Sequence, residues 1–251
     1  MHRPDVIERY ATFAELRPQC VSSDDEWLSI GEQRELDHLS HPTRRETWRL
    51  GRLLSKQIIL EAYSISTADF ASIDIMSRND TRQAVRPVVS IDGEVMPCCL
   101  SISHTDAAAL AVLTTSENHS IGCDLVRVEE VSQGFLDTWF TARERSGLHS
   151  ATAGDVARAW AAKEAAYKAY NNGEAFTPRR IEIIRLPNGN LTCSYRGQDL
   201  SGHCEIRNRM IDGFVALVVI ADSSIAGDRT TDSESTVNNA EESSIHSAVS
   251  T

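Results

Sequence analysis

The sequence predicts an α+β fold made of two subdomains of similar size, followed by a disordered tail. Helical patterns and short strand-like runs occur in a similar order in both halves of the first 222 residues. A hydrophobic content of 41% and a charged content of 24% are those of an ordinary globular protein. The last 29 residues have no aromatic side chain and hold twelve serines or threonines. The predicted divisions are therefore residues 1–115, 116–222 and 223–251.

The first subdomain is predicted to contain two helices followed by two strands. Residues 24–39 and 43–63 have the spacing of apolar residues that is typical of helices. Residues 98–103 (CCLSIS) and 107–114 (AAALAVLT) are short apolar runs, which favour strands.

The second subdomain is predicted to repeat this mixture, although no repeat of residue identities is visible. A strand-like run, SIGCDLV (120–126), precedes a helix around Trp139 and a second helix over Asp155–Tyr170, which contains no Pro or Gly. Four more strand-like runs follow, at residues 180–186, 191–195, 202–208 and 213–221.

The charge and the apolar pattern exclude several classes of protein. The formal net charge is −11, and residues 223–251 hold five acids and one arginine, so the part before the tail carries −7. This balance argues against a nucleic-acid binder that works by bulk charge. No apolar run approaches the ~20 residues that cross a bilayer, and the N-terminus lacks the apolar core of a signal peptide. We therefore expect a cytoplasmic protein without a membrane partner. The six cysteines form no CxxC pair, which favours buried free thiols.

The segment WAAKEAAYKAY (160–170) allows two interpretations. Its residue types are strong helix formers, and Glu164 and Lys168 lie one turn apart on one helix face. One interpretation is an exposed ion pair worth about 0.3–0.5 kcal/mol. The other is a functional face, because Trp160 lies one turn before Glu164 and indicates that this face is partly covered. A partly buried carboxylate beside Lys163 and Lys168 would be a candidate catalytic or ligand-binding group.

The segment IGCDLV places an aspartate inside an apolar strand. Gly122, Asp124 and Val126 would share one face of the strand, opposite Ile121 and Cys123. A buried aspartate is costly unless it is paired or binds a metal, although an aspartate that caps a turn at the strand end is an equal alternative. We expect Gly122 to leave space for a ligand beside Asp124.

Two further segments carry groups that suit phosphate. Ser103 and His104 stand at the end of a strand-like run in SISHTD, where a structural role is the alternative. In RRETWRLGRLLSK, basic residues recur at helical spacing and form a stripe that is either a solvated face or an anion site. The members of this stripe are Arg45, Arg49, Arg52 and Lys56.

Taken together, these segments resemble the signature of the phosphopantetheinyl transferases, in which G-x-D precedes W/F-x-x-K-E-x-x-x-K. Here GCDLV is followed about 40 residues later by WAAKEAAYK. The ISHT run, the WRLGRLLSK helix and FTARE (140–144) resemble the long, monomeric, surfactin-synthetase type. That type joins two halves in one chain, each similar to a subunit of the short holo-acyl-carrier-protein synthases. The resemblance runs from Trp48 to Ile220 and implies a pseudo-twofold arrangement and a monomer.

The resemblance also implies roles for individual residues. It places Mg²⁺ on Asp124 and Glu164, in keeping with the preference of this ion for carboxylate oxygens. It places Lys168 at the pyrophosphate of coenzyme A, and it makes Glu164, Lys168 and Asp124 the catalytic set. The residues expected to contact coenzyme A are Arg45, Arg52, Arg86, Ser103, His104, Lys163 and Lys168.

Two positions depart from the family pattern. Long-type members often carry an acid two residues after the aspartate, where this chain has Val126. Either a water or one of the nearby acids, Glu129 or Glu130, would then complete the metal site. The glycine expected before Arg86 is Val85.

The resemblance implies transfer of phosphopantetheine from coenzyme A to a serine of an apo acyl or peptidyl carrier protein. Mg²⁺ would neutralise the phosphate charge, and Glu164 would act as general base. Two other readings remain: a degenerate member that binds coenzyme A without turnover, and a different Mg²⁺-dependent phosphotransferase or hydrolase. The absence of G-x-x-x-x-G-K-[ST] argues against a nucleotide kinase of the P-loop type.

Overall fold

The computed structural model describes residues 6–20, 24–65, 70–78, 84–149, 151–170, 175–186 and 188–224. The predicted disordered tail, 223–251, lies outside the described residues from residue 225 onward. No helix within the described ranges is both long enough and apolar enough to span a membrane.

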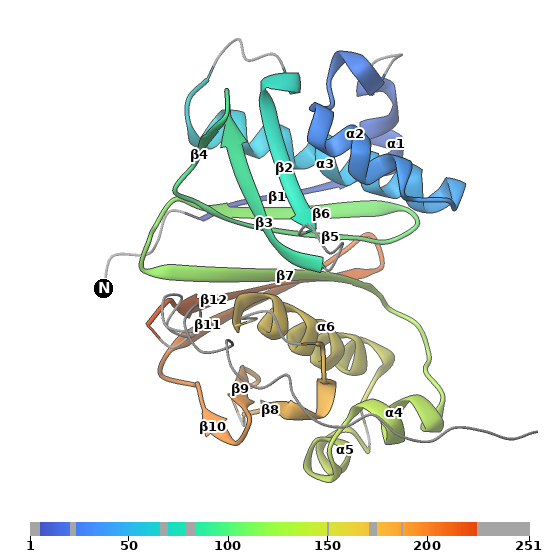
Figure 1. Cartoon of the computed structure of the whole chain (residues 1–251). Helices are drawn as coiled ribbons and strands as arrows, with labels where there is room; N and C mark the ends of the chain where they lie inside the picture. The colour runs from blue at the N-terminus through green and yellow to red at the C-terminus, as the bar shows by residue number, and fades with distance from the viewer. Residues whose placement is uncertain are drawn as a thin grey trace, which may run out of the picture.

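The N-terminal half begins with a strand, continues through helices and ends in strands (Figure 1). Its helices are α1 (Phe13–Leu16), α2 (Ile30–Asp37) and α3 (Pro42–Ala62), with 3₁₀ turns at Arg17–Gln19, Asp24–Glu26 and Phe70–Ser72. Its strands are β1 (Val6–Thr12), β2 (Ile73–Arg78), β3 (Ala84–Ile91), β4 (Glu94–Val95), β5 (Cys99–His104) and β6 (Ala108–Thr114).

The C-terminal half has the same succession of elements. Its helices are α4 (Gln133–Trp139), α5 (Ala142–Leu148) and α6 (Ala153–Tyr170), with a 3₁₀ turn at Pro178–Arg180. Its strands are β7 (His119–Arg127), β8 (Ile181–Arg185), β9 (Leu191–Tyr195), β10 (Gln198–Asp199), β11 (Cys204–Ile211) and β12 (Phe214–Asp222).

The sheet topology repeats between the halves. The order β1-β6-β5 in the first half corresponds to β7-β12-β11 in the second, and β2-β3-β4 corresponds to β8-β9-β10. Every pairing is antiparallel. This repetition confirms the predicted α+β class with two similar subdomains. The predicted boundary after residue 115 lies in the turn between β6 and β7, where the succession of elements starts again.

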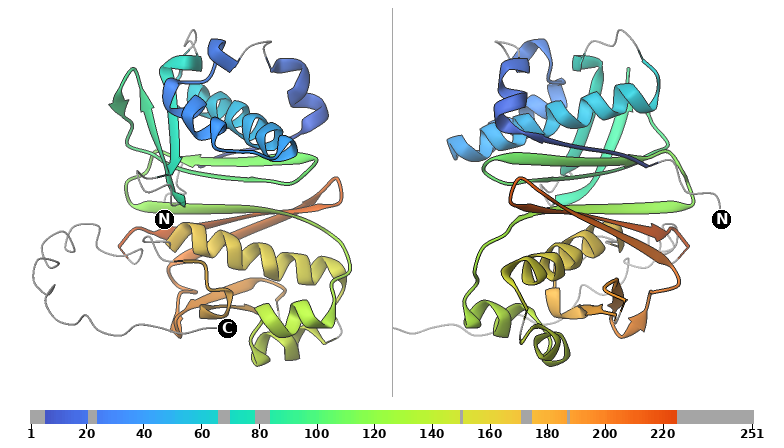
Figure 2. Two further views of the ribbon diagram at one scale, coloured as in Figure 1. Left: turned by 45° about the vertical axis from the view of Figure 1, so that its right-hand side comes forward. Right: turned by 180° about the vertical axis from the view of Figure 1, so that it is seen from behind.

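The two larger sheets lie face to face, with α3 on the outer side of one and α6 on the outer side of the other (Figures 1 and 2). Alternate residues of β6 point to the two sides. Leu110 and Val112 enter the apolar layer between the sheets, whereas Ala111 and Leu113 pack beneath α3. The strands β7 and β12 divide their side chains in the same way between that central layer and α6.

Helix capping explains why two predicted helices are divided. The Ser29 hydroxyl accepts from the Glu32 amide, and the Glu32 carboxylate accepts from the Ser29 amide, so α2 begins at Ile30. The predicted helix over 24–39 is therefore a 3₁₀ turn followed by α2. Thr141 and Glu144 form the same capping box at α5, so two short helices replace the single helix predicted around Trp139.

Four strands of the first half were missed in the sequence: β1, β2, β3 and the two-residue β4. β1 (VIERYAT) has no regular alternation of apolar and polar residues, and its side chains are only partly buried. β2 (IDIMSR) buries Ile73 and Ile75, but its alternation of apolar and polar residues stops after Ile75. β3 contains Pro87, which cannot donate to a strand ladder and so argues against a strand.

Gly122 allows α6 to approach β7 closely. A Cβ at Gly122 would overlap the carbonyl oxygen of Ala165 and lie 2.6 Å from the amide nitrogen of Ala169. The space beside Gly122 is filled by the helix backbone. The expectation that this glycine admits a ligand is therefore wrong, because it admits a helix instead.

We predict that Gly122→Ala destabilises the fold by about 3 kcal/mol or more, because the helix backbone cannot yield as a flexible side chain would. Denaturant unfolding would measure the loss. The control is Gly147→Ala on α5, where a Cβ meets nothing within 4 Å; it should be neutral or slightly stabilising. Equal stability of the Gly122→Ala variant and the natural protein would contradict the assigned role.

Candidate functional site

A cavity of about 460 Å³ lies where the end of β5, the strand β7 and the helix α6 meet. It brings together five of the residues that the sequence predicts for the site, although they come from three separate segments. The residues lining it are Ile102, Ser103, His104, Asp124, Leu125, Val126, Arg127, Trp160, Glu164 and Lys168.

Asp124 is buried at the centre of this arrangement. Its Oδ1 accepts hydrogen bonds from the Ser103 hydroxyl at 2.7 Å and from the Lys168 Nζ at 2.9 Å. Lys168 also donates to the carbonyl of Cys123 at 2.9 Å. The face of β7 that carries Asp124 is turned toward α6, while Cys123 and Leu125 belong to the layer between the sheets. The predicted division of the strand faces is therefore confirmed.

Glu164 lies close enough to Asp124 for the two carboxylates to share a hydrogen bond. Desolvation and the negative charge of Asp124 raise the pKa of Glu164 to about 7, against a smaller opposing effect of Lys168. Trp160, one turn earlier on α6, lines the same cavity. Two carboxylates and a lysine thus occupy one small, partly covered region.

The donor set fits a hard divalent cation. Two carboxylates held together repel each other when both are ionised, and a cation between them would remove that repulsion. Mg²⁺ uses one or two protein carboxylates and takes its remaining ligands from water and substrate phosphate. No third Asp, Glu, His or Cys joins the pair within the part of the chain that the structure describes. Val126 borders the cavity two residues after Asp124, where long-type members of the resembled family often carry an additional acid.

The acids Glu129 and Glu130 do not line this cavity. They border a neighbouring one of about 330 Å³, together with Val131, Phe135 and Trp160. Of the alternatives for the missing ligand at Val126, this placement favours water.

His104 stands at the junction of the first cavity with two others, of about 430 and 290 Å³. Its pKa is lowered by desolvation and then by the positive charges of Lys168, Arg44 and Arg52. Arg44 and Arg78 line the larger of these two cavities. The smaller is lined by Arg52, Ser77, Arg78, Arg86, Pro87, Tyr167 and Lys168, among others. A basic groove therefore leads from Asp124 into the N-terminal half.

Ser103 has a role that the sequence does not reveal. Besides donating to Asp124, its hydroxyl accepts from the Leu125 amide at 3.2 Å. Ser101 accepts from the Cys123 amide at 2.9 Å in the same way. These two serines fasten β5 to β7, so Ser103 orients the aspartate, and its hydroxyl is already engaged.

Lys163 does not belong to the site, contrary to the prediction. Its ammonium group is fully buried, pairs with Glu144 at 2.8 Å and donates to the carbonyls of Pro178 and Ile181. All its donors are directed away from the cavity into the core of the C-terminal half. A position next to Glu164 on a helix places the two side chains on different faces.

The structure also differs from the prediction of a continuous basic stripe. Arg52 and Lys56 are buried and paired with acids, so neither is a solvated cation. Arg45 donates to the carbonyls of Leu36 and Leu39 and closes the end of α2. Its neighbour Arg44 lines the groove instead.

Arg86 reaches the groove but is fixed by the C-terminal half. It donates to the Ser120 hydroxyl at 2.5 Å and to the carbonyls of Lys168 and Ala169. It therefore caps the end of α6. Arg44, Arg78, Trp48 and Tyr167 were missed, because the sequence gives each of them no distinguishing pattern.

The chain is similar in sequence to known proteins over the region that holds this site. Residues 120–219 match the model of the 4'-phosphopantetheinyl transferase superfamily. The match includes Asp124, Glu164 and Lys168, and it covers the region in which the two carboxylates meet.

One curated protein to which the chain is similar is a holo-[acyl-carrier-protein] synthase from Verminephrobacter eiseniae. It is 40% identical over 74 residues, which cover 25% of this chain and 56% of the relative. The chain thus spans little more than half the length of that protein. Among solved structures, the holo-[acyl-carrier-protein] synthase of Thermotoga maritima aligns with a TM-score of 0.34 and 22% identity. This alignment covers 41% of this chain and 62% of that one.

We predict that Glu164→Gln stabilises the metal-free protein in a pH-dependent way. The folded pKa of Glu164, about 7, exceeds its ordinary value of 4.5, so its ionisation destabilises the fold fully above about pH 7 and not below about pH 4.5. Melting with a chelator should show a gain of a few degrees at about pH 8 and little gain at about pH 5. Glu117→Gln, in an exposed turn, serves as control, and an equal gain at both pH values would contradict the prediction.

A second prediction concerns the buried lysine. Lys163→Met leaves Glu144 buried without its partner and should lower the free energy of unfolding by about 3–5 kcal/mol. Any affinity for coenzyme A, the ligand that the family resemblance implies, should change by less than about twofold in the folded variant, since the ammonium does not face the cavity. A normal melting temperature combined with weakened binding of coenzyme A would restore Lys163 to the site.

Proposed function

We propose that the protein transfers the 4'-phosphopantetheine arm of coenzyme A to a serine of an apo acyl or peptidyl carrier protein, in a Mg²⁺-dependent reaction. The observation that carries this proposal is the grouping of Asp124, Glu164 and Lys168 in a cavity that continues into a basic groove. The match to the transferase superfamily over this region supports the same chemistry.

The groove supplies binding for a long polyanionic donor. Coenzyme A carries a pyrophosphate and a 3'-phosphate, and arginine and lysine are the side chains that bind such groups best. Lys168 and His104 lie beside the carboxylate pair, and Arg44, Arg78 and Arg86 lie farther along. In our proposal Lys168 and His104 bind the pyrophosphate, and the arginines bind the phosphates beyond it.

Asp124 and Glu164 would hold Mg²⁺, which when bound neutralises negative charge on the pyrophosphate. Ser103 and Lys168 keep Asp124 in place through the hydrogen bonds to its Oδ1. Lys168 stabilises charge on the leaving side, as a donor already held in place by Asp124 and the Cys123 carbonyl.

In the proposed step, the serine oxygen of the carrier attacks the phosphorus that bears the pantetheine arm. A new P–O bond forms, the bond from that phosphorus to the bridging oxygen breaks, and adenosine 3',5'-bisphosphate leaves with the electron pair. The serine proton passes to Glu164, directly or through a water. The product is the holo carrier protein.

The proposal extends to the type and setting of the enzyme. Each half contributes one wall of the site, β5 from the first and β7 with α6 from the second, so a single chain would suffice. This supports a monomer of the long, surfactin-synthetase type acting in the cytoplasm. With a formal net charge of −11, the protein would need a locally basic or apolar surface to receive an acidic carrier protein.

A second candidate is a protein that binds coenzyme A without turnover. Val126 favours it, because an apolar side chain borders the cavity where an additional carboxylate would strengthen metal binding. The two candidates differ in one product, since only the transferase releases adenosine 3',5'-bisphosphate.

We predict a gain of one phosphopantetheine on at least one apo carrier protein incubated with this protein, coenzyme A and Mg²⁺. Intact mass spectrometry of a panel of carriers would detect it. Glu164→Ala and Asp124→Ala should each lower the rate by about a hundredfold or more, as loss of a metal ligand and base would. A chelator should stop the reaction.

Glu117→Ala is the matched control for this experiment and should leave the rate unchanged. If no carrier gains mass while calorimetry still detects binding of coenzyme A, the transferase proposal fails and the binding protein replaces it. If the rate persists with a chelator, the role of Mg²⁺ is refuted.

A further inference from the structure

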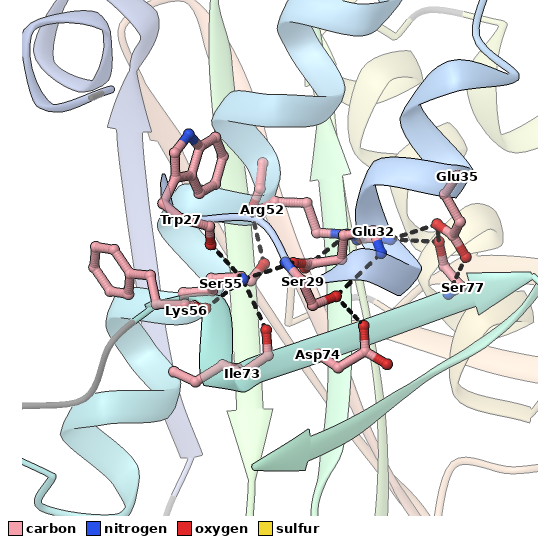
Figure 3. A network of polar contacts seen from close by, with 12 residues as sticks. Trp27, Ser29, Glu32, Glu35, Arg52, Ser55, Lys56, Ile73, Asp74 and Ser77 are labelled. Carbon is pink, nitrogen blue, oxygen red and sulfur yellow. Dashed lines mark hydrogen bonds and ion pairs between the residues drawn. The ribbon is translucent and has the colours of Figure 1, made fainter. Parts of the chain in front are cut away.

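A network of buried charged side chains lies between α2, α3 and β2, outside the site described above (Figure 3). Lys56 pairs with Glu32 at 2.6 Å, and both side chains are fully buried. The same ammonium donates to the carbonyls of Trp27, Phe70 and Ile73. Every donor of Lys56 is therefore satisfied inside the protein.

The C-terminal half contains a second copy of this arrangement. Lys163 pairs with Glu144 and donates to the carbonyls of Pro178 and Ile181, at the start of β8. In each copy the glutamate belongs to a capping box. The cap hydroxyls, from Ser29 and Thr141, donate to Asp74 and Glu182 respectively. Because both halves have it, the lysine–glutamate pair belongs to the fold and not to a site.

The N-terminal half has a further charged layer that its counterpart lacks. Arg52, four residues before Lys56, and Glu35, three residues after Glu32, form an ion pair at 3.0 Å, with 4% and 6% of their side chains exposed. The corresponding positions of the C-terminal half are Ala159 and Gly147. The fold can therefore be built without this pair, so its presence in one half calls for another explanation.

The Glu35 carboxylate holds the end of β2. Its Oε1 accepts from the backbone amides of Ser77 at 2.8 Å and Arg78 at 2.9 Å. Its Oε2 accepts from the Ser77 hydroxyl and from Arg52, each at 3.0 Å, and Arg52 also donates to that hydroxyl. Four donors thus converge on one carboxylate.

This contact falls where the ladder between β2 and β3 is irregular. Met76 pairs with Val88, but Arg78 pairs with Ala84, so the register shifts at Ser77. Opposite this point β3 carries Arg86 and Pro87, and proline has no amide hydrogen. Irregular pairing of this kind redirects side chains and leaves backbone groups without ladder partners. Glu35 accepts from such groups.

The segment that Glu35 holds is a wall of the basic groove. Ser77 and Arg78 line both cavities that extend from His104 into the N-terminal half. The Arg52 guanidinium lies 4.6 Å from the centre of the Trp48 ring, and Trp48 lines the same two cavities. The buried pair is therefore connected to the groove through Arg78 on one side and through Trp48 on the other.

We propose that Glu35, supported by Arg52, is a positioning residue that sets Arg78 for recognition of a phosphate of the donor. The identity of the donor, coenzyme A, rests on the proposed function. Glu35 touches neither the donor nor the reacting atoms, and it acts by fixing the backbone from which Arg78 projects. The groove recognises a phosphorylated nucleotide group along this wall because the backbone that carries the arginine is held in one place before the ligand arrives.

The test is a double-mutant cycle on the full chain, read by calorimetric binding of coenzyme A and by steady-state transfer to a carrier. Glu35→Gln keeps the shape but removes one acceptor and the charge opposite Arg52. We expect it to raise the Kd and KM for coenzyme A about tenfold and to change kcat by less than about twofold. In an Arg78→Ala background the same substitution should have little further effect.

Ser77→Ala provides a milder second variant if Glu35→Gln does not fold, and it should raise the KM by about threefold with kcat unchanged. Glu35→Asp, which retains the charge, should recover part of the affinity that Glu35→Gln loses. Glu117→Gln is the matched control for a glutamate on the surface.

Two outcomes would overturn the positioning role: a fall in kcat with unchanged KM, as expected from partial unfolding, or additive effects of the Glu35 and Arg78 substitutions. Failure of the proposed function is recognised separately. If coenzyme A binds but no carrier is modified, the binding cycle alone still decides the role of Glu35. If coenzyme A does not bind the natural protein, both proposals fail.

Discussion

The site depends on one close contact, the approach of the α6 backbone to β7 over Gly122. At this distance the strand presents Asp124 to the helix face that carries Glu164 and Lys168. A side chain in the place of Gly122 would move the helix away from the strand. The two carboxylates, separated by about 40 residues of chain, would then lie too far apart to share one cation.

The same helix is held at its C-terminal end by the other half of the protein. Arg86 of β3 donates to the carbonyls of Lys168 and Ala169, where the negative end of the helix dipole favours a cation. Ser103 of β5 holds the strand β7 in place, since its hydroxyl donates to Asp124 and accepts from the Leu125 amide. The geometry of the carboxylate pair is therefore a property of both halves together, although both acids come from one of them.

Much of the fold follows from local pattern, whereas the site follows only in part. The long helices and apolar strands are predicted, because burial there imposes a clear period. Short strands with polar residues, such as β1, are not predicted, because half-buried positions show no regular alternation of apolar and polar residues. Asp124, Glu164 and Lys168 are identified as a set through the resemblance of GCDLV and WAAKEAAYK to the family signature. Lys163 shows the limit of the sequence, because a lysine next to Glu164 in a signature motif looks functional, and only its burial against Glu144 shows otherwise.

The duplicated architecture separates what the fold needs from what the site needs. Features present in both halves, such as the buried lysine–glutamate pairs, serve folding. Features present in one half need a further reason. Within the described residues, the carboxylate pair of the cavity comes from the C-terminal half, and Arg52 and Glu35 lie behind the groove in the N-terminal half. Burying two charges gives little net stability over an apolar pair, so the ion pair is better explained by the four hydrogen bonds with which Glu35 holds the groove wall than by stability alone.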